Sequence, residues 1–255
     1  MIRGFESGLA HLKARRDDHL PPLACDRLWR SGRIDGGYQE MIHLASINER
    51  PSLVSKPLDA CRACNIPGSE PLVAQDNFGF SVPSLGALVE GWVLVFPRRH
   101  VLALNQLSDL EWSEFNRHAE LTRQMVKVAY GEFIQFEHGS AGVGRTAACG
   151  VDHAHLHIVA LSIDLREAIH HIEHEVGAFD WEPVAGRVPM GVASDYIWVQ
   201  DATGQWMAQA DVLPSQVVRR AIAAAIECDE WDWKLAHRRE LMLRTSERLI
   251  GARQS

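Results

Sequence analysis

Short apolar segments separated by turn residues make up the middle of this chain. Their length and their content of β-branched and aromatic residues are typical of strands, and Pro83, Gly86 and Gly91 lie between two of them. The segments that we predict to be strands are PLVA (71–74), NFGFSV (77–82), WVLVF (92–96), EFIQFEHG (132–139) and the histidine-rich stretch 153–161. The first three of these segments predict a meander of short antiparallel strands.

A helical pattern interrupts the strands at residues 108–130, SDLEWSEFNRHAELTRQMVKVAY. Ser108 and Glu111 have the spacing of a capping box, which marks the start of a helix. Apolar residues at helical spacing lie broadly along one side: Leu110, Phe115, Leu121, Met125 and Val128. We therefore expect a long amphipathic helix packed on the sheet. Strands grouped around one long helix favour the α+β class over a doubly wound sheet.

The last third of the chain predicts helices and one hairpin. The expected elements are a helix over 164–176, a hairpin over 195–209 that turns at Asp201–Gly204, a helix from Pro214 and a final helix from about Lys234. We predict three parts: an N-terminal extension over 1–55, a central domain over 56–162, and a helical C-terminal extension over 163–255 packed on that same domain.

Composition limits the class of protein. The chain has 255 residues, of which 46% are hydrophobic and 23% charged, so it can bury a full core. The net charge of −7 argues against a general nucleic-acid binder, which needs a broad basic surface. The most apolar stretch, GALVEGWVLVF (86–96), is too short to span a bilayer and carries Glu90. With no apolar run of signal-peptide length at the start, we expect a cytoplasmic protein without a membrane partner.

Cysteine and histidine carry the candidate chemistry. Five cysteines form an odd set, and Cys61 and Cys64 alone lie close together in sequence, which favours a metal or redox site over a disulfide framework. His170, His171 and His174 also cluster, but at helical spacing and without an acidic or cysteine partner at ligand spacing, so we predict a solvated helix face.

The stretch CGVDHAHLHIVAL (149–161) places three histidines at alternate positions. In a strand, His153, His155 and His157 would share one face, while the residues between them point into the core: Ala154, Leu156, Ile158 and Ala160. Either a metal cage or a nucleophilic histidine with helpers could use such a face. One ion cannot easily bind all three histidines, because His153 and His157 would lie about 13 Å apart along a strand.

The motif HAHLHIV resembles the signature of the histidine triad (HIT) family of nucleotide hydrolases and transferases. GALVEGWVLVFPRRH (86–100) is similar to the strand-turn-strand segment of that family, which ends in a proline and then a histidine. FEHG (136–139) followed by CGVDHAH also resembles galactose-1-phosphate uridylyltransferases of the same superfamily. The resemblance covers about residues 60–161 and implies a HIT-like antiparallel sheet with a packed helix, which makes 56–162 the catalytic domain.

The resemblance also implies catalytic roles. His155 corresponds to the nucleophile that attacks the α-phosphorus of a nucleotide and forms a nucleotidyl-histidine intermediate. A neutral imidazole suits this role at pH 7. His157 corresponds to the histidine that positions or protonates phosphate oxygens and the leaving group, and His138 stands where relatives carry an asparagine that contacts the phosphate or leaving group.

Candidate substrate contacts follow the same correspondence. Backbone N–H groups at Gly139, Ser140 and Gly150 are expected to face phosphate oxygens. A side chain for the ribose hydroxyls is expected among Asp76, Asn77 and Ser84. Arg145, with Arg98 or Arg99, is a further candidate for the phosphate. The candidates for stacking on the base are Trp92, Phe78 and Phe80. The candidates for closing over the phosphates are Gln216, Arg219 and Arg220.

In the zinc-containing branch of the superfamily, two cysteines and two histidines bind one zinc ion. The corresponding residues here are Cys61, Cys64, His100 and His153, a closed set that implies a structural zinc, so the chemistry itself would need no metal. The resemblance thus implies a nucleotidyl hydrolase that releases a nucleoside monophosphate. Histidine at 157, where uridylyltransferases carry glutamine, favours hydrolysis over transfer.

Several questions stay open at this stage. The substrate could be a dinucleoside polyphosphate, a nucleoside phosphoramidate or a related adenylate. A nucleotidyltransferase or phosphorylase, and a zinc-stabilised nucleotide-binding module without turnover, are the alternatives. The expected partner is a nucleotide and not a nucleic acid, and a homodimer is left open.

Overall fold

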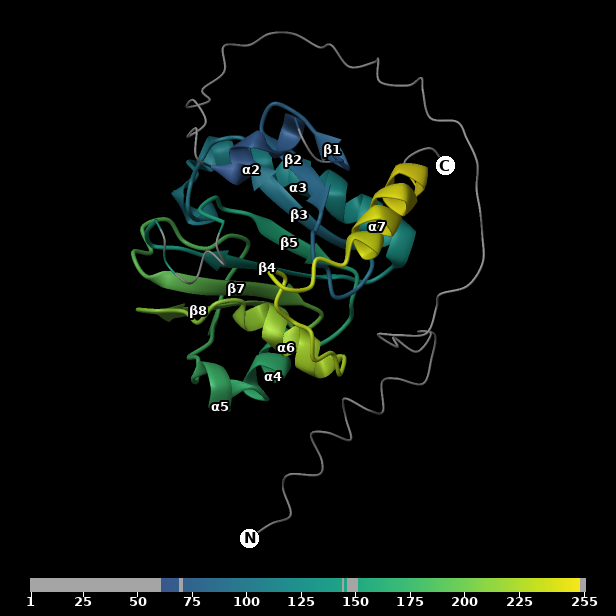
Figure 1. The fold of residues 1–255 in the computed structure, drawn as a ribbon. Helices are drawn as coiled ribbons and strands as arrows, with labels where there is room; N and C mark the ends of the chain where they lie inside the picture. The colour runs from purple at the N-terminus through teal and green to yellow at the C-terminus, as the bar shows by residue number, and fades with distance from the viewer. Residues whose placement is uncertain (1–60, 69–70, 144, 146–150, 253–255) are drawn as a thin grey trace. The chain divides into compact units, whose positions relative to one another are not determined.

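The computed structural model describes residues 61–68, 71–143, 145 and 151–252, and these form a single eight-stranded sheet with helices on both faces (Figure 1). The strand order is β1-β2-β3-β5-β4-β7-β8-β6, and every neighbouring pair is antiparallel. The predicted α+β class is therefore confirmed, and so is the antiparallel meander of the first three strands, whereas β5 lies between β3 and β4. The N-terminal extension predicted over 1–55 lies outside the described residues.

The strands agree with the predicted segments, with differences in length. They are β1 (Ala74–Gln75), β2 (Gly79–Pro83), β3 (Trp92–Pro97), β4 (Ile134–Gly139), β5 (Leu156–Val159), β6 (Glu182–Pro183), β7 (Asp195–Asp201) and β8 (Gly204–Ala210). The predicted hairpin is β7–β8, with Asp201 opposite Gly204 at its turn. Strand β5 is shorter than predicted, so His153 and His155 lie in the segment that leads into it.

Helix α3 (Asp109–Tyr130) begins at the predicted capping box: the Ser108 side chain accepts from the backbone N–H of Glu111, and the Glu111 side chain accepts from the N–H of Ser108. Its buried face differs from the predicted one. The residues that face the protein are Phe115, His118, Ala119, Thr122, Met125 and Val126. Leu110, Leu121 and Val128 are exposed instead, because the sheet covers a stripe that includes polar residues.

The C-terminal helices also differ from prediction in their limits. They are α4 (Leu165–His170), α5 (Glu173–Val176), α6 (Val217–Ala225) and α7 (Arg239–Ala252). The single helix expected over 164–176 is divided into α4 and α5, with a break at Ile172. The last helix was expected from about Lys234 but begins at Arg239, directly after Arg238, whose φ is 43°. The histidines at 170, 171 and 174 are exposed, as predicted for a solvated face.

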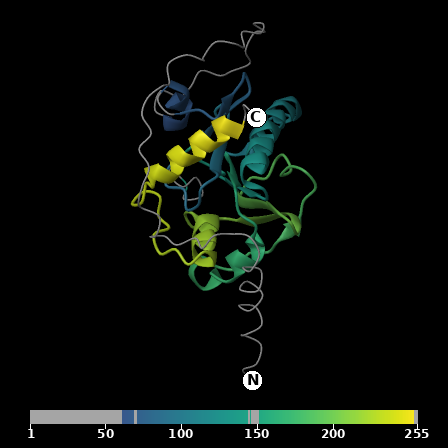
Figure 2. The same cartoon turned by 90° about the vertical axis from the view of Figure 1, so that its right-hand side faces the viewer.

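The two faces of the sheet have separate hydrophobic cores. On one face, Phe136, Ile197 and Val199 pack with residues of α4 and α6, including Ile169 and Val218. On the other face, residues of β3, β5 and β7 pack with Phe115 of α3 and Leu249 of α7. Figure 2 shows α7 beside α3, in agreement with their contacts. Alternation along β4 and β5 therefore places His138 and His157 on the α6 face, beside Phe136.

The domain limits at 56–162 and 163–255 stay a prediction, although β7 of the C-terminal part pairs directly with β4. No helix in the described part of the chain has the length and apolarity needed to cross a bilayer.

Candidate active site and metal centre

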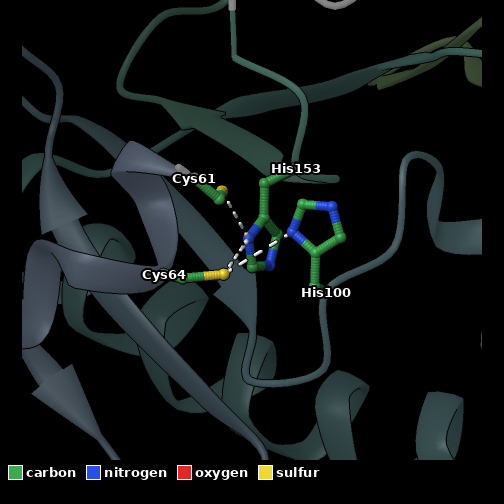
Figure 3. Close-up of side chains that lie close together, drawn as sticks. All are labelled: Cys61, Cys64, His100 and His153. Carbon is green, nitrogen blue, oxygen red and sulfur yellow. Dashed lines mark hydrogen bonds between the residues drawn. The ribbon is translucent and has the colours of Figure 1, made fainter. Parts of the chain in front are cut away.

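Two cysteines and two histidines converge beside the first strands (Figure 3). They are Cys61, Cys64, His100 and His153, and one ligand atom from each lies within 4.8 Å of all the others. Helix α2 (Arg62–Asn65) places the cysteines one turn apart, with Cys61 at its N-cap. His100 follows β3, and His153 precedes β5. The structure thus brings together the four residues that the sequence analysis assigned to zinc.

The distances fit a tetrahedral metal ion. Nδ1 of His153 lies 3.7 Å from Sγ of Cys61 and 3.5 Å from Sγ of Cys64, and Nδ1 of His100 lies 3.5 Å from Sγ of Cys64. Zinc bonds of ~2.3 Å to sulfur and ~2.0–2.1 Å to nitrogen require sulfur–nitrogen separations of about 3.6 Å in a tetrahedron. The residues present can therefore hold a metal ion of this kind.

His153 has the protonation that a ligand needs. Its Nε2 donates to the carbonyl of Pro97 at 2.9 Å, which leaves Nδ1 unprotonated and turned toward the cysteines. Burial lowers the pKa of His153 to about 4, and the nearby His100 and His155 also lower it. The imidazole is therefore neutral at pH 7. With four protein ligands the site is closed, so a bound metal would have a structural role.

His155 presents one free, unprotonated ring nitrogen. Its Nδ1 lies 2.8 Å from the backbone carbonyl of His153, and because a carbonyl can only accept, Nδ1 carries the proton. In the neutral ring Nε2 then holds a lone pair, and no described residue hydrogen-bonds to it. Burial lowers the pKa of His155, which favours this neutral form. The ring is held in place by stacking on Phe96, with centroids 5.1 Å apart.

His157 has the opposite tautomer. The indole Nε1 of Trp92 donates to Nδ1 of His157 at 3.0 Å, and because indole nitrogen is a donor only, Nδ1 must be unprotonated. Nε2 of neutral His157 is therefore an N–H donor. The ring stacks on Phe136 with centroids 4.2 Å apart and lies 4.7 Å from the ring of His155. Burial, followed by the nearby His155, His138 and Arg219, lowers the pKa of His157 well below its usual value.

His138 lies next to this pair. Its ring centroid is 6.3 Å from that of His157, and its Nε2 accepts from the backbone N–H of Val218, in the first turn of α6, at 3.4 Å. Burial, with the nearby His155 in second place, lowers the pKa of His138 to about 3, so this ring is also neutral at pH 7. The three histidines are thus neutral, and Nε2 of His155 is the unprotonated ring nitrogen that accepts no hydrogen bond, whereas Nδ1 of His157 and Nε2 of His138 accept from Trp92 and Val218.

A cavity of about 100 Å³ adjoins these residues. His138, His155 and His157 line it together with Ser84, and its other walls come mainly from apolar side chains. Gln216 and Arg219 of the C-terminal part also line it. The guanidinium of Arg219 donates to the carbonyls of Gly86 and Trp231 and lies 5.2 Å from the ring of Trp92. A fixed cation therefore lies beside the neutral histidines.

The candidate ribose and base residues are divided between this cavity and other parts of the fold. Ser84 and Trp92 line the cavity, whereas Asn77 and Phe78 are exposed and Phe80 stacks on Phe96 in the core.

Asp76 has a structural partner instead. Its carboxylate accepts from the backbone N–H groups of Phe78 and Gly79 and lies 3.1 Å from Nδ1 of His118. Although burial acts in the other direction, the hydrogen bond to His118 and the two turn hydrogen bonds lower the pKa of Asp76 to about 2. The structure therefore places Asp76 in a turn and not at the cavity.

The candidate phosphate residues show a similar division. Arg145 donates to Asp195, which is fully buried, with 3.0 Å from Nε to Oδ2. Ser140 donates to the carbonyl of Gly142, and the ring of Tyr196 covers Gly139.

The remaining candidates lie away from the cavity or outside the described residues. The arginines at 98, 99 and 220 contact Gln75, Glu111 and Glu175. Gly150 is not among the described residues.

The sequence did not predict the roles of three residues at the site. Trp92 donates to His157, Phe136 stacks on His157, and Phe96 stacks on His155. Trp233, which also lines the cavity, was missed entirely. Strand alternation could have placed Phe136 beside His138, since the two are separated by one residue in EFIQFEHG.

Neither a protein-family model nor a curated protein matches the chain at a significant level. Solved structures that are similar to part of it include those of three bacterial proteins. They are SMU.412c from Streptococcus mutans UA159 (18% identity, TM-score 0.35), a member of the HIT family of proteins from Bacillus subtilis (16%, 0.35) and a HIT family protein from Bacillus anthracis str. 'Ames Ancestor' (22%, 0.34). Each match covers 40% of this chain, and 66%, 72% and 72% of the respective solved chains.

Proposed function

We propose that this protein is a nucleotidyl hydrolase that attacks the α-phosphate of a nucleotide with Nε2 of His155. The observation that carries the proposal is the tautomer of this ring: the carbonyl of His153 fixes the proton on Nδ1, so that the nitrogen without a partner is the nucleophilic one. An imidazole held in this way needs no base to remove a proton before it attacks.

The first step forms a bond between Nε2 of His155 and the α-phosphorus and breaks the bond from phosphorus to the leaving oxygen. The electron pair of the broken bond stays on that oxygen. His157 donates a hydrogen bond to it from Nε2–H, which stabilises the developing charge. A protonated His157 would carry a second proton on Nδ1, directed at the N–H of Trp92, so His157 acts as a hydrogen-bond donor and not as a source of a full proton.

This restriction favours leaving groups that depart as anions. In a phosphoanhydride the leaving group is the terminal phosphate of a second nucleotide, and it departs as an anion. An amine or an alcohol needs a proton to leave. We therefore propose phosphoanhydrides, such as dinucleoside polyphosphates, as the substrate class, and place nucleoside phosphoramidates second. In the second step water attacks phosphorus and the phosphorus–nitrogen bond breaks, with its electron pair returning to Nε2 of His155. The proton that the water loses passes to solvent, and nucleoside monophosphate is released.

The remaining groups position the substrate in this proposal. His138 contacts the phosphate or leaving group, Arg219 supplies the positive charge next to the phosphate, and Ser84 reaches the ribose. A phosphoryl group fits in a cavity of about 100 Å³, but small-molecule sites usually have ~300–1000 Å³. Binding of a whole nucleotide therefore requires lining side chains such as Trp233 to move.

We propose zinc as the ion at Cys61, Cys64, His100 and His153. When bound, it supplies a rigid link between α2 and the segment that carries His155, and it takes no part in the two chemical steps.

The test uses the full-length protein with diadenosine polyphosphate as substrate. His155→Ala should lower kcat by several orders of magnitude, because a nucleophile cannot be replaced by the surrounding groups, while adenosine monophosphate still binds. His174→Ala, at an exposed histidine, is the matched control and should keep full activity. Turnover in His155→Ala above about a hundredth of the wild-type rate would contradict the assignment.

The same assay separates hydrolysis from transfer. Added inorganic phosphate should leave the yield of adenosine monophosphate unchanged. With diadenosine tetraphosphate, hydrolysis yields adenosine monophosphate and adenosine triphosphate, so formation of adenosine diphosphate with added phosphate would identify a phosphorylase. Binding without any turnover would identify a nucleotide-binding module.

A further inference from the structure

A second, larger cavity lies on the opposite face of the sheet from the histidines. It has a volume of about 420 Å³, within the range of ~300–1000 Å³ that is usual for small-molecule sites. Its walls are α3, the strands β4, β7 and β8, and the segment around Arg187. It shares no lining residue with the cavity at His155. Strand alternation explains this, since Gln135 and Glu137 point away from the face that carries Phe136 and His138.

Carboxamide side chains form much of the polar part of its wall, and four of them are oriented by hydrogen bonds. Arg123 donates to the amide oxygens of Asn116 at 3.0 Å and Gln135 at 2.9 Å, and Gln135 in turn donates to the amide oxygen of Gln200 at 2.6 Å. The backbone N–H of Gly186 donates to the amide oxygen of Gln205 at 2.9 Å. These contacts decide which end of each amide is the oxygen.

The amide nitrogens at the ends of these hydrogen bonds are left as donors. Nδ2 of Asn116, Nε2 of Gln200 and Nε2 of Gln205 donate to no other group among the described residues. A further donor belongs to Trp198, which also lines the cavity: it is 5% exposed, and its Nε1 has no hydrogen-bond partner in the described part of the chain. Of these donors only the indole nitrogen is fully buried, and a buried donor without a partner costs free energy. The three amide nitrogens belong to half-buried side chains that a ligand can reach. The wall therefore suits a ligand with several oxygen acceptors.

Most charged side chains around the cavity are engaged inside the protein and leave one cation for a ligand with a single negative charge. Glu137 is one of them, since its two oxygens accept from the backbone of Leu104 and the hydroxyl of Tyr196. Arg123 is paired with Glu120, and Arg187 with Asp109, so neither cation is available to a strongly charged ligand. Lys127 also lines the cavity, and it makes no ion pair among the described residues. Apolar side chains of Leu104, Leu156 and Val188 complete the wall and can contact C–H groups.

We propose that this cavity is a second binding site, for an oxygen-rich organic monoanion of the sugar-acid class. Ring or chain oxygens accept from the amide donors, and the carboxylate lies next to Lys127. The inference is independent of the reaction at His155, because it rests on different residues on the other face of the sheet.

Isothermal titration of the full-length protein with D-glucuronate tests the proposal, with D-glucose and inorganic phosphate as comparison ligands. We expect saturable binding of glucuronate, and at least tenfold weaker binding of the other two. Gln200→Leu should weaken glucuronate at least tenfold, since it removes one donor. Gln135→Leu should have a similar effect, because Gln135 lines the cavity and orients Gln200. Gln209→Leu, at an exposed position of β8 outside the cavity wall, should change nothing.

Two further variants keep the test decisive if a buried substitution disturbs folding. Gln205→Leu, at a half-buried position, should also weaken binding, and Lys127→Ala should remove the preference for glucuronate over glucose. The proposal is wrong if no ligand binds at about 10 mM, a concentration that would detect even a millimolar Kd. It is also wrong if glucuronate binding is unchanged in Gln200→Leu and Gln205→Leu, or if phosphate binds more tightly than glucuronate.

Discussion

Glu137 makes the stability of this protein depend on pH in a direction that can be tested. The side chain lies behind His138 on the other face of β4 and is 2% exposed. Its Oε1 accepts from the backbone N–H of Leu104 at 2.6 Å, and its Oε2 accepts from the hydroxyl of Tyr196 at 2.7 Å. Burial raises the pKa of Glu137 from 4.5 to about 7, against the opposing effect of these hydrogen bonds and of Arg187.

The direction of the effect follows from proton binding. The folded carboxyl holds its proton more tightly than the unfolded one, so its contribution to stability is complete below pH 4.5 and is lost as the pH rises through about 7. At 1.36 kcal/mol for each pKa unit, the loss amounts to about 3 kcal/mol. Glu137→Gln removes the titration and keeps a side chain that can both accept and donate. The free energy of unfolding of the wild type, relative to this variant, should therefore fall by about 3 kcal/mol between pH ~4 and pH ~8.

Urea unfolding followed by tryptophan fluorescence at several pH values measures this difference. The subtraction is needed because histidines with lowered pKa values, such as His138, destabilise both proteins as the pH falls below 6.5. Glu132→Gln, at an exposed position just before β4, is the matched control. A wild-type minus Glu137→Gln difference that stays constant across this range, or that grows with pH, would refute the reasoning.

Three further substitutions test other parts of the account. Wild-type protein should contain about one equivalent of zinc per chain. Cys64→Ser should lower both the zinc content and the melting temperature, because structural metal binding contributes to folding. Wild-type protein that contains no zinc after expression in zinc-supplemented cells would contradict this. Gly139→Ala should cost about 1–3 kcal/mol or more in urea unfolding, since the added Cβ would lie 2.1 Å from the ring of Tyr196, and unchanged stability would show that this packing is wrong. Trp92→Phe should lower kcat about tenfold with little change in KM, because His157 loses the hydrogen bond that fixes its tautomer, and an unchanged kcat would remove Trp92 from the site.

Local patterns predicted the parts of the structure that depend on neighbours in sequence. The capping box at Ser108 and the turn between β7 and β8 involve residues three apart, and the structure confirms both. The convergence of Cys61, Cys64, His100 and His153 was also predicted, but through a family resemblance, since no local rule brings residues so far apart in sequence together.

Long-range packing decided the features that the sequence analysis missed. Arg145 was expected at a phosphate, but Asp195, fifty residues away in sequence, is fully buried and needs a cation. The long helix α3 buries Phe115 and leaves Leu121 exposed, because the position of the sheet selects the covered stripe. The tautomers of the histidines depend on a tryptophan and on backbone carbonyls, which no spacing rule reveals.

The covalent intermediate on His155 is the most direct test of the proposed mechanism. The wild-type protein would be mixed with a dinucleoside polyphosphate labelled at the α-phosphate and denatured at alkaline pH, where a phosphorus–nitrogen bond to histidine survives. The account predicts label on the protein, located by peptide mass spectrometry on His155 and absent from His155→Ala. Turnover by a competent wild-type enzyme with no labelled protein at any reaction time, or with label on another residue, would contradict it.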